Sequence, residues 1–327
     1  MFHGRSWQAK AFGEPTDVLR LEDLEFPEPA EGTVLVKVHA CGLGLPDLLM
    51  VTGNYPLLPE PPVSPGQEVA GEVVATTGNS AFSVGDRVMG LTTFLDRRGG
   101  YGDYAYLIEQ KTRRVPASLT DAEAAGLLIG FRTAFAGLAD RVRLAAGETL
   151  LVLGAAGSSG SSAVILGKAL GATVIAAAGS EEKLAFCRGI GADHVVDYRA
   201  RDIGEAVKEI TDGHGADVLF DPVGGAQGTK ALAGIARLGR VAVVGYASGS
   251  WLTLDPLDMV MRSYTAAGVF AAGTPEEDQV AFDRLTQLAA ERTITVPVTT
   301  VASFDDVPAV IAAAQSGKPG KTVVTMN

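Results

Sequence analysis

Residues that bind transition metals or form disulfides are scarce in this sequence. Its 327 residues include two cysteines and four histidines. Cys41 and Cys187 do not form a C-x-x-C pair, and the histidines form no spaced cluster. Two scattered cysteines argue against a disulfide framework and favour a reducing compartment. We therefore expect neither disulfides nor a metal site.

Basic residues are outnumbered by acidic ones. The chain has 27 Lys and Arg residues against 38 Asp and Glu residues, which gives a formal net charge of −11 and a pI of about 4.9. This charge would repel nucleic-acid phosphates and anionic membrane surfaces. It does not exclude an anionic cofactor, because nearby basic residues decide whether such a molecule binds. We expect no nucleic-acid partner.

A solid apolar block of membrane-spanning length is also missing. The longest uncharged stretch, 149–167, is interrupted by glycines and serines, which favours a soluble α/β core over a transmembrane helix. The N-terminal segment MFHGRSWQAKAFGEP lacks the apolar region of a signal peptide. We therefore expect a cytoplasmic protein that does not bind membranes.

Two patterns follow one another along the chain. In the first part, short alternating runs such as Thr33–Gly42 are divided by Gly, Pro and Asp turns, which predicts half-buried strands and a small β-barrel or sandwich. A capped helical pattern follows near Leu119. From Thr149, strand, Gly-rich turn and helix repeat, which predicts a doubly wound parallel sheet. Its six strands are TLLVLG, ATVIAAA, DHVVDY, ADVLFDPVG, RVAVVGY and YTAAGVF.

The C-terminal pieces do not extend the parallel pattern. After Gly273 come a helix at Pro275–Glu291, strand-like residues and a second short helix. We expect these pieces to return to the first domain, which would then be discontinuous. The predicted domains are residues 1–122 with 274–327, and residues 123–273.

The strongest motif lies at the start of the parallel pattern. Strand LLVL runs into Ala155-x-Gly157-x-x-Gly160 and then a helix, which is the dinucleotide fingerprint with Ala in place of the first Gly. Gly157 would let the backbone approach a pyrophosphate, and Gly160 would let the helix pack closely on the strand. The helix N-terminus offers donors to the anion. The predicted contacts are Ala156, Gly157, Ser158, Ser159 and Gly160.

The end of the second strand distinguishes NAD from NADP. An NAD site usually carries Asp or Glu there, whereas this chain has Ala177, Ala178, Gly179 and Ser180. Ser180 can donate a hydrogen bond to a 2′-phosphate, and Lys183 can supply positive charge. Tyr198, after the third strand, would reach the same pocket. The acids Glu181 and Glu182 are typical of a helix start. We therefore predict NADPH.

These residues, in this order, resemble the medium-chain dehydrogenase/reductase superfamily, and most closely its zinc-free NADPH:quinone oxidoreductase, or zeta-crystallin-like, family. The resemblance covers essentially the whole chain. It is carried by VLVKVHACGLGLPDLLM, GNYPLLPEPPVSPGQEVAGEV, ETLLVLGAAGSSG, GADHVVDY, DPVGG and GRVAVVGYASG, among others. It implies an α/β protein with a GroES-like β-barrel domain and a Rossmann domain that contains a doubly wound, parallel six-stranded sheet.

The same resemblance indicates that zinc is absent. The positions that match the catalytic zinc ligands of zinc-dependent relatives are Gly44, Gln67 and Ile129, and none supplies the thiolate or imidazole that zinc requires. Residues 92–106, where those relatives carry a structural zinc lobe, contain no cysteine. Cys41 lies three residues from the first ligand position and is expected to be a core residue. A zinc alcohol dehydrogenase would return only if the purified protein held stoichiometric zinc.

Without a metal, a conjugated acceptor is easier to reduce than a simple ketone. We therefore expect hydride transfer to a quinone or an α,β-unsaturated carbonyl. Tyr55, in TGNYPLLP, resembles a tyrosine placed to donate a proton in enoyl-thioester reductases, although water is an alternative proton source. Gln67 would bind a substrate oxygen or a water. Glu68 is expected to pair with an arginine or a backbone amide, and Asp47 to cap a helix.

Further positions follow from the resemblance. Relatives carry Asn where this chain has Gly44, which removes an amide and opens the substrate pocket. Aromatic walls from Phe94, Phe131 and Tyr101 would suit a flat apolar substrate, although each is equally typical of a core. The residues expected near the nicotinamide and in the cofactor cleft are Thr133, Val244, Gly245, Tyr246 and Phe270.

Two other functions stay open. An enoyl-thioester reductase would need a basic entrance, for which Arg97, Arg98, Arg132 and Arg262 are the candidates. Some relatives are instead NADPH-binding crystallin-like or RNA-binding proteins, and the net charge of −11 argues against RNA. Relatives often pair the edge strand of the Rossmann sheet across a two-fold axis, so we expect a homodimer that uses YTAAGVF.

Overall fold

The structure is a computed structural model that describes residues 1–58 and 60–326. It contains two units, and the chain passes from the first to the second between Ile129 and Gly130. The first unit comprises residues 1–129, 274–317 and 321–327, and the second comprises residues 130–273 and 318–320. The domain limits 1–122, 123–273 and 274–327 remain a proposal.

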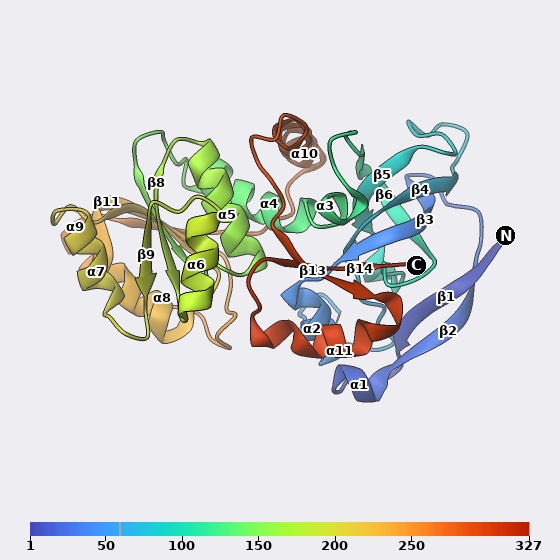
Figure 1. Cartoon of the computed structure of the whole chain (residues 1–327), viewed down its shortest axis with the longest axis horizontal. Coiled ribbons are helices and arrows are strands. Elements are labelled where there is room, and N and C mark those ends of the chain that lie inside the picture. The colour runs from blue at the N-terminus through green and yellow to red at the C-terminus, as the bar shows by residue number, and fades with distance from the viewer. Residues whose placement is uncertain (59, 327) are drawn as a thin grey trace. The chain divides into compact units, whose positions relative to one another are not determined.

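The first unit is built around antiparallel strands. One sheet has the order β13-β14-β3-β4-β5-β6, and β6 also pairs with β3, which closes β3 to β6 into a barrel. Strands β1 and β2 form a separate antiparallel ribbon (Figure 1). The strands are β1 (Phe2–Ala9), β2 (Leu19–Phe26), β3 (Thr33–Gly42), β4 (Glu68–Ala75), β5 (Arg87–Thr92), β6 (Tyr104–Arg114), β13 (Val298–Ser303) and β14 (Lys321–Thr325).

Helical segments connect these strands. Thr120 caps α3 through its side chain, and Glu123 returns the bond to the Thr120 N–H, so the predicted helix start is correct. The capped helical pattern forms two helices, because α3 ends at Ala125, with Gly126 as its C-cap, before α4 begins at Leu128. The helical segments are α1 (Pro15–Val18), α2 (Leu45–Val51), η1 (Phe94–Asp96), α3 (Asp121–Ala125), α10 (Pro275–Ala290), η4 (Phe304–Asp306), α11 (Val307–Ala312) and η5 (Ala313–Ser316). Helix α4 (Leu128–Phe135) begins in the first unit and continues into the second.

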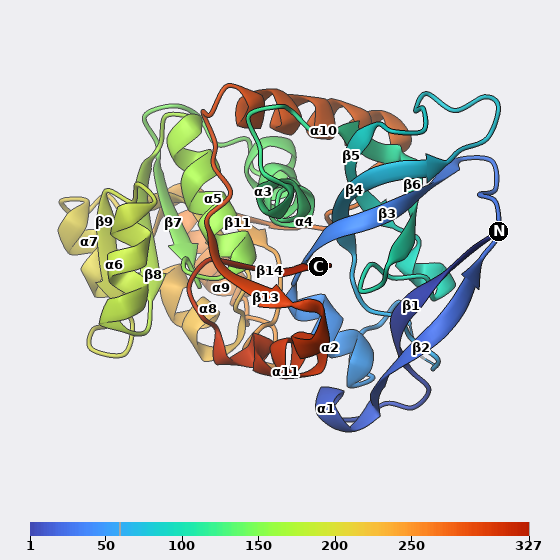
Figure 2. The ribbon, with the colours of Figure 1, turned by 45° about the vertical axis from the view of Figure 1, so that its right-hand side comes forward.

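Strand β3 is more deeply buried than its sequence suggests. Val34 and Val36 belong to the main core of the unit, whereas Leu35 points to the other face and packs with Phe26 and Ala75. The prediction of a half-buried strand was therefore wrong. The second face of β3 is covered by tertiary packing, because Phe26 belongs to β2, which pairs with β1 in a separate sheet. Figure 2 shows that β14, near the C-terminus, lies beside β3.

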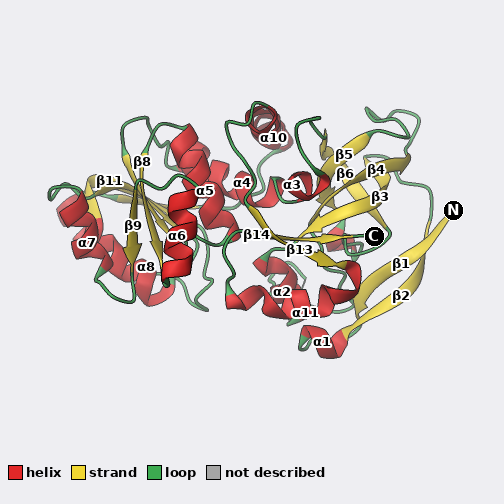
Figure 3. Cartoon of the chain, viewed as in Figure 1, coloured by secondary structure: helices red, strands yellow, loops and turns green. Residues whose placement is uncertain are grey.

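The second unit contains the predicted parallel sheet. Its order is β12-β11-β10-β7-β8-β9, and all of these pairings are parallel, which confirms the six-stranded doubly wound sheet. One face packs on α5, where Gly167 lies against Leu150, and the other buries Leu151 with residues of α7 and η3. Figure 3 shows the alternation of strands and helices.

The strands of this sheet are β7 (Thr149–Leu153), β8 (Thr173–Ala178), β9 (His194–Asp197), β10 (Ala216–Asp221), β11 (Ile235–Val243) and β12 (Thr265–Gly268). The helical segments are η2 (Ala136–Arg141), α5 (Ser158–Ala169), α6 (Glu181–Gly189), α7 (Ile203–Ile210), α8 (Gly225–Ala231), η3 (Leu232–Gly234) and α9 (Pro256–Arg262). Within the described residues, none of the helices has both the length and the apolar character needed to cross a bilayer.

Candidate active site

A Gly-rich loop joins β7 to α5 in the second unit. Gly154 has a φ of 54°, and Gly157 is the N-cap of α5. A methyl group at Gly160 would overlap the carbonyl oxygen of Gly154, so the close packing of the helix on this turn requires glycine. A methyl group at Gly157 would have no neighbour nearer than 3.3 Å. Packing therefore explains Gly160 but not Gly157, and an open glycine before a helix leaves the backbone accessible to an anion.

Ser158, Ser159 and Ala156 are the other predicted contacts in this loop. Ser158 and Ser159 are the first two residues of α5, where backbone N–H groups have no partner within the helix. The carbonyl oxygen of Ala156 accepts a hydrogen bond of 2.8 Å from the N–H of Gly320. This bond holds the loop from a distant part of the chain, which the sequence pattern did not predict.

Three residues predicted to bind a 2′-phosphate gather at the end of β8. Ser180 is the N-cap of α6, and its hydroxyl accepts a 3.4 Å hydrogen bond from the Lys183 N–H. That hydroxyl can still donate its own hydrogen. The ring of Tyr198 lies across Gly179, because a methyl group there would be 2.8 Å from Tyr198 Oη. No carboxylate of the described residues pairs with the Lys183 side chain.

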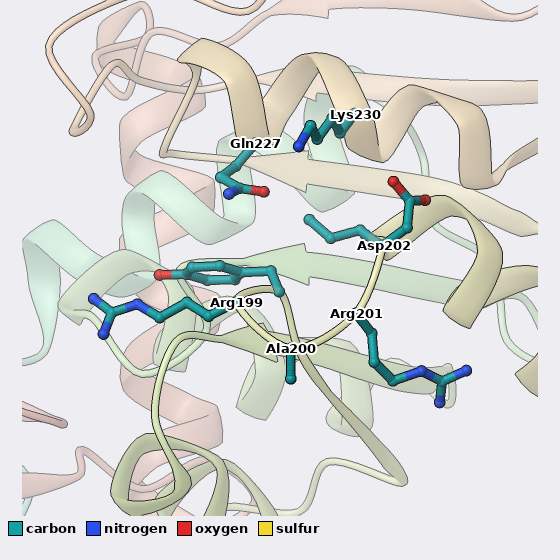
Figure 4. A pocket seen from close by; sticks show the side chains of 8 residues that line it. Arg199, Ala200, Arg201, Asp202, Gln227 and Lys230 are labelled. Carbon is teal, nitrogen blue, oxygen red and sulfur yellow. The ribbon is translucent and has the colours of Figure 1, made fainter.

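Tyr198 also lines a cavity of about 300 Å³ at the segment between β9 and α7. Arg201 is paired with Glu209 at 2.5 Å, and Asp202 caps α7. In Figure 4, the side chains of Arg199 and Arg201 extend in opposite directions. The lining residues are Tyr198, Arg199, Ala200, Arg201, Asp202, Ile203, Gln227 and Lys230.

Two cations of this cavity were missed by the sequence analysis. Over residues 1–58 and 60–326, neither Arg199 nor Lys230 has a carboxylate partner. Such cations are unusual in a chain with a net charge of −11, and they suit an anionic ligand. Arg199 could have been found, because it directly follows Tyr198. Lys230 could not, because α8 reaches the cavity only in the folded chain.

The residues after β11 lie at the carboxyl edge of the sheet, where open α/β sheets bind ligands. The N–H groups of Val244 and Gly245 donate to the carbonyl oxygen of Asp221 at 2.9 and 3.2 Å. The ring of Tyr246 packs against Trp251, with centroids 4.8 Å apart. Phe270 is 70% exposed, so it has no packing role that would explain its apolar side chain.

Asp221 is a buried carboxyl group at the same edge. Its Oδ1 accepts hydrogen bonds from the N–H groups of Val223 and Gly224, at 2.9 and 2.8 Å. Its Oδ2 is buried without a partner among the described residues. Burial raises the pKa of this carboxyl, and the two N–H groups oppose that shift. The sequence analysis did not predict that this residue fixes the loop that precedes α8.

Tyr55 and Gln67 meet in the first unit. Gln67 is buried, and its Nε2 donates a 3.2 Å hydrogen bond to Tyr55 Oη. Phe94 packs against the Tyr55 ring, with centroids 6.3 Å apart. Gly44 is the N-cap of α2 and has an extended backbone that any residue could adopt. The structure thus links Tyr55, Gln67 and Phe94, and the Tyr55–Gln67 bond was not predicted.

Glu68, Lys321 and Asp47 are buried charged groups of the same unit. Glu68 Oε1 accepts a 2.7 Å bond from Lys321 Nζ, and Glu68 Oε2 accepts a 2.9 Å bond from the Ile129 N–H. The predicted backbone amide partner of Glu68 is present, but the predicted arginine is a lysine. Burial raises the pKa of Asp47 to about 6, although hydrogen bonds from the N–H groups of Gly44 and Gly66 lower it.

Two aromatic residues lie in the core. Phe131 and Tyr101 have no exposed surface, which favours the core interpretation over a pocket wall. Thr133 lies in α4 and is partly buried. Cys41 is also fully buried, as expected of a core cysteine, and burial raises its pKa well above the usual range.

The positions that hold zinc in zinc-dependent relatives have other roles here. Gln67 contacts Tyr55, the Gly44 N–H donates to Asp47, and the Ile129 N–H donates to Glu68. In the part of the chain that the structure describes, no three His, Cys, Asp or Glu side chains are grouped to hold a metal ion.

Family models match both units. The alcohol dehydrogenase GroES-like domain matches residues 30–118, and the zinc-binding dehydrogenase model matches residues 160–288. The name zinc-binding dehydrogenase belongs to the family model and does not by itself assign zinc to this chain. The three positions that correspond to catalytic zinc ligands all lie outside residues 160–288.

Relatives and solved structures match over nearly the whole chain. A quinone oxidoreductase-like protein 2 homolog of Nematostella vectensis is 36% identical over 278 residues, which cover 84% of this chain and 75% of that protein. The quinone oxidoreductase of Pseudomonas syringae pv. Tomato DC3000 has a TM-score of 0.89 at 28% identity, covering 99% of this chain and 100% of its own.

A mycobacterial protein solved in complex with NADPH has a TM-score of 0.88 at 29% identity, with 99% of this chain and 100% of that chain covered. Both family models, the identity to the quinone oxidoreductase-like relative and the missing zinc ligands agree. The chain therefore belongs to the zinc-free quinone oxidoreductase family of the medium-chain dehydrogenase/reductase superfamily.

Proposed function

We propose that this protein is a zinc-independent, NADPH-dependent oxidoreductase that reduces a quinone or an α,β-unsaturated carbonyl. The observation that carries the cofactor assignment is the end of β8. It lacks a carboxylate, and Ser180, Tyr198 and the cations Lys183 and Arg199 follow β8 and β9. The mycobacterial neighbour with bound NADPH supports the same assignment.

The residues of the second unit fit a dinucleotide. Gly160 allows α5 to begin directly behind the turn, and the backbone at Gly157 is open. Ser158 and Ser159 would hold the pyrophosphate at the helix N-terminus. Bound NADPH would supply the hydride, and the protein supplies orientation and the proton.

Tyr55 is the proposed proton donor of the first unit. Gln67 donates to the Tyr55 oxygen, so this hydrogen bond does not use the hydrogen of the phenol, which is the one proposed to pass to a substrate oxygen. A phenol is protonated near neutral pH, which suits an acid. Hydride added to the conjugated carbon and a proton added to the oxygen together balance the reduction.

Three of the four basic residues named for a thioester entrance have other partners, whereas the described residues give the Arg97 side chain none. Arg132 pairs with Asp140 at 3.1 Å, and Arg262 pairs with Asp258. Arg98 donates a 3.4 Å bond to the carbonyl oxygen of Glu25. An enoyl-thioester reductase therefore gains no support from Arg98, Arg132 and Arg262, and Arg97 is the one named cation left for a thioester. A crystallin-like protein would bind NADPH without turning over any substrate. Measuring NADPH oxidation with quinones, 2-alkenals and enoyl-CoAs therefore distinguishes a quinone or enone reductase, an enoyl-thioester reductase and a crystallin-like protein.

The homodimer and the cytoplasmic location remain proposals. Two features support the dimer. Strand β12 is an edge strand of the parallel sheet, and the nearby α9 exposes Leu257, Val260 and Met261, each more than two-thirds accessible.

We expect the protein to bind NADPH at least about tenfold more tightly than NADH, and Lys183→Ala to remove about tenfold of that preference, because an ionic hydrogen bond contributes about 1.5–3 kcal/mol. Fluorescence titration of both cofactors measures the preference. The control is Lys208→Ala, which removes an exposed helix lysine paired with Glu205. Equal affinities of the wild type for the two cofactors would refute the assignment.

Tyr55→Phe should lower turnover of an enone at least about tenfold with little change in NADPH affinity, because the variant keeps the ring and loses the proton donor. Steady-state rates at saturating NADPH measure this effect. Tyr106→Phe is the matched control, since Tyr106 Oη only donates to the carbonyl oxygen of Pro27 at 2.8 Å. An unchanged rate for Tyr55→Phe would leave water as the proton source.

A further inference from the structure

Asp47 is a buried carboxyl group held by two backbone amides. It is 1% exposed and is the third residue of α2. Its Oδ2 accepts a hydrogen bond from the Gly44 N–H, and its Oδ1 accepts one from the Gly66 N–H, each of 2.7 Å. A carboxylate presents only acceptors, whereas asparagine would place an NH₂ group against one of these N–H donors. The site therefore requires an acid.

The two amides belong to the segments that carry Tyr55 and Gln67. Gly44 begins α2, which ends at Val51, and the Asn54 N–H bonds back to the Leu49 carbonyl oxygen just before Tyr55. Gly66 directly precedes Gln67. The side chain of Asp47 is thus a cross-link between the two backbones whose side chains form the Tyr55–Gln67 hydrogen bond.

The Gly66 end of this cross-link is rigid. Gly66 has a φ of 102°, and a methyl group there would lie 2.6 Å from the Gly100 nitrogen. Its carbonyl oxygen accepts from Thr92 Oγ1 at 2.7 Å and from the Gly100 N–H at 2.8 Å. The Gly66 carbonyl oxygen is thus held by β5 and by the loop at residue 100. The other backbone polar group of Gly66, its N–H, is held by Asp47.

We propose that Asp47 is a positioning residue, which joins the segment of Tyr55 to that of Gln67 and thereby sets the hydrogen bond that orients the proton donor. This role rests on the proposed function of Tyr55. Asp47 acts through backbone amides and touches no reacting atom.

The role makes turnover sensitive to pH. The titratable groups around Asp47 are Lys321 and Glu68, which form an ion pair, together with Cys41 and Tyr101. Because burial raises the pKa of Asp47 to about 6, the carboxyl becomes protonated in mildly acidic solution. A protonated oxygen no longer accepts equally well from both N–H groups, so the cross-link weakens. Turnover should therefore fall below about pH 6.

The test compares enone turnover of the wild type, Asp47→Asn, Tyr55→Phe and the double variant at saturating NADPH, from about pH 5 to about pH 8. We expect Asp47→Asn to lower kcat about tenfold near neutral pH and to leave NADPH affinity within about twofold. We also expect this variant to lose the acid limb, which is the fall in turnover that the wild type shows in mildly acidic solution. In the Tyr55→Phe background the same change should cost less than about twofold, because both act on one step. Asp86→Asn is the control, since Asp86 accepts from the Ser83 N–H elsewhere in the unit.

The outcomes separate the two roles. If Tyr55→Phe lowers turnover but Asp47→Asn does not, only the positioning role is refuted. Independent, multiplicative effects of the two variants would also refute it. If Tyr55→Phe changes nothing, the donor role fails and the positioning role fails with it. Should Asp47→Asn not fold, the acid limb decides: it should be present in the wild type and absent in Tyr55→Phe, and the same limb in both would overturn the inference.

Discussion

Replacing Lys321 with methionine should lower the free energy of unfolding by about 3–5 kcal/mol, because it leaves a buried carboxylate without its partner. The ion pair joins Lys321 Nζ to Glu68 Oε1 over 2.7 Å, and the two side chains are 3% and 2% exposed. Methionine would also remove the 2.8 Å bond from Lys321 Nζ to the carbonyl oxygen of Leu43. Urea unfolding followed by circular dichroism measures the effect.

An exposed pair is the control for this effect. Lys10 and Glu22 form an ion pair of 2.6 Å in which the lysine side chain is 75% exposed. Lys10→Met should change the free energy of unfolding by no more than about 1 kcal/mol, because water already solvates both charges. The double variant Glu68→Gln, Lys321→Met should recover much of the loss, because neither member of the ion pair is then left charged without its partner, and glutamine can still accept from the Ile129 N–H. A loss that is the same for Lys10→Met and Lys321→Met would contradict the burial argument.

Gly160→Ala should lower the free energy of unfolding by about 3 kcal/mol, the upper end for an overpacked site, and weaken NADPH binding at least about tenfold. The added methyl group would overlap the Gly154 carbonyl oxygen, which is backbone and cannot rotate away as a side chain can. Either the loop at Gly154 or the first turn of α5 must move. Urea unfolding and NADPH titration report the two effects.

Gly157→Ala is the matched variant for this prediction. The site has no neighbour within 3.3 Å and its φ is −79°, so alanine should change stability by less than about 1 kcal/mol. If the pyrophosphate approaches this backbone, the methyl group should still weaken NADPH binding. The two glycines thus separate packing from binding. Unchanged NADPH affinity in Gly157→Ala would place the pyrophosphate elsewhere.

The local parts of the fold could be predicted from the sequence. The six parallel strands, the start of α3 at its cap and the role of Gly160 depend on residues that are close together in the chain, because periodicity, capping and turn geometry act over a few positions. The helix break at Gly126 and the burial of β3 on both faces could not, since they depend on what each element packs against.

The candidate site divides in the same way. Three of its features follow from the residue types alone: the family resemblance, the lack of zinc ligands at the matching positions and the group of residues at the end of β8. Three contacts are visible only in the folded chain: Gln67 bonds to Tyr55, Asp47 accepts from Gly66, and Glu68 pairs with Lys321, 253 positions away. These contacts have no sequence signal, because a hydrogen bond or ion pair between distant segments exists only once the strands and helices that carry them are packed.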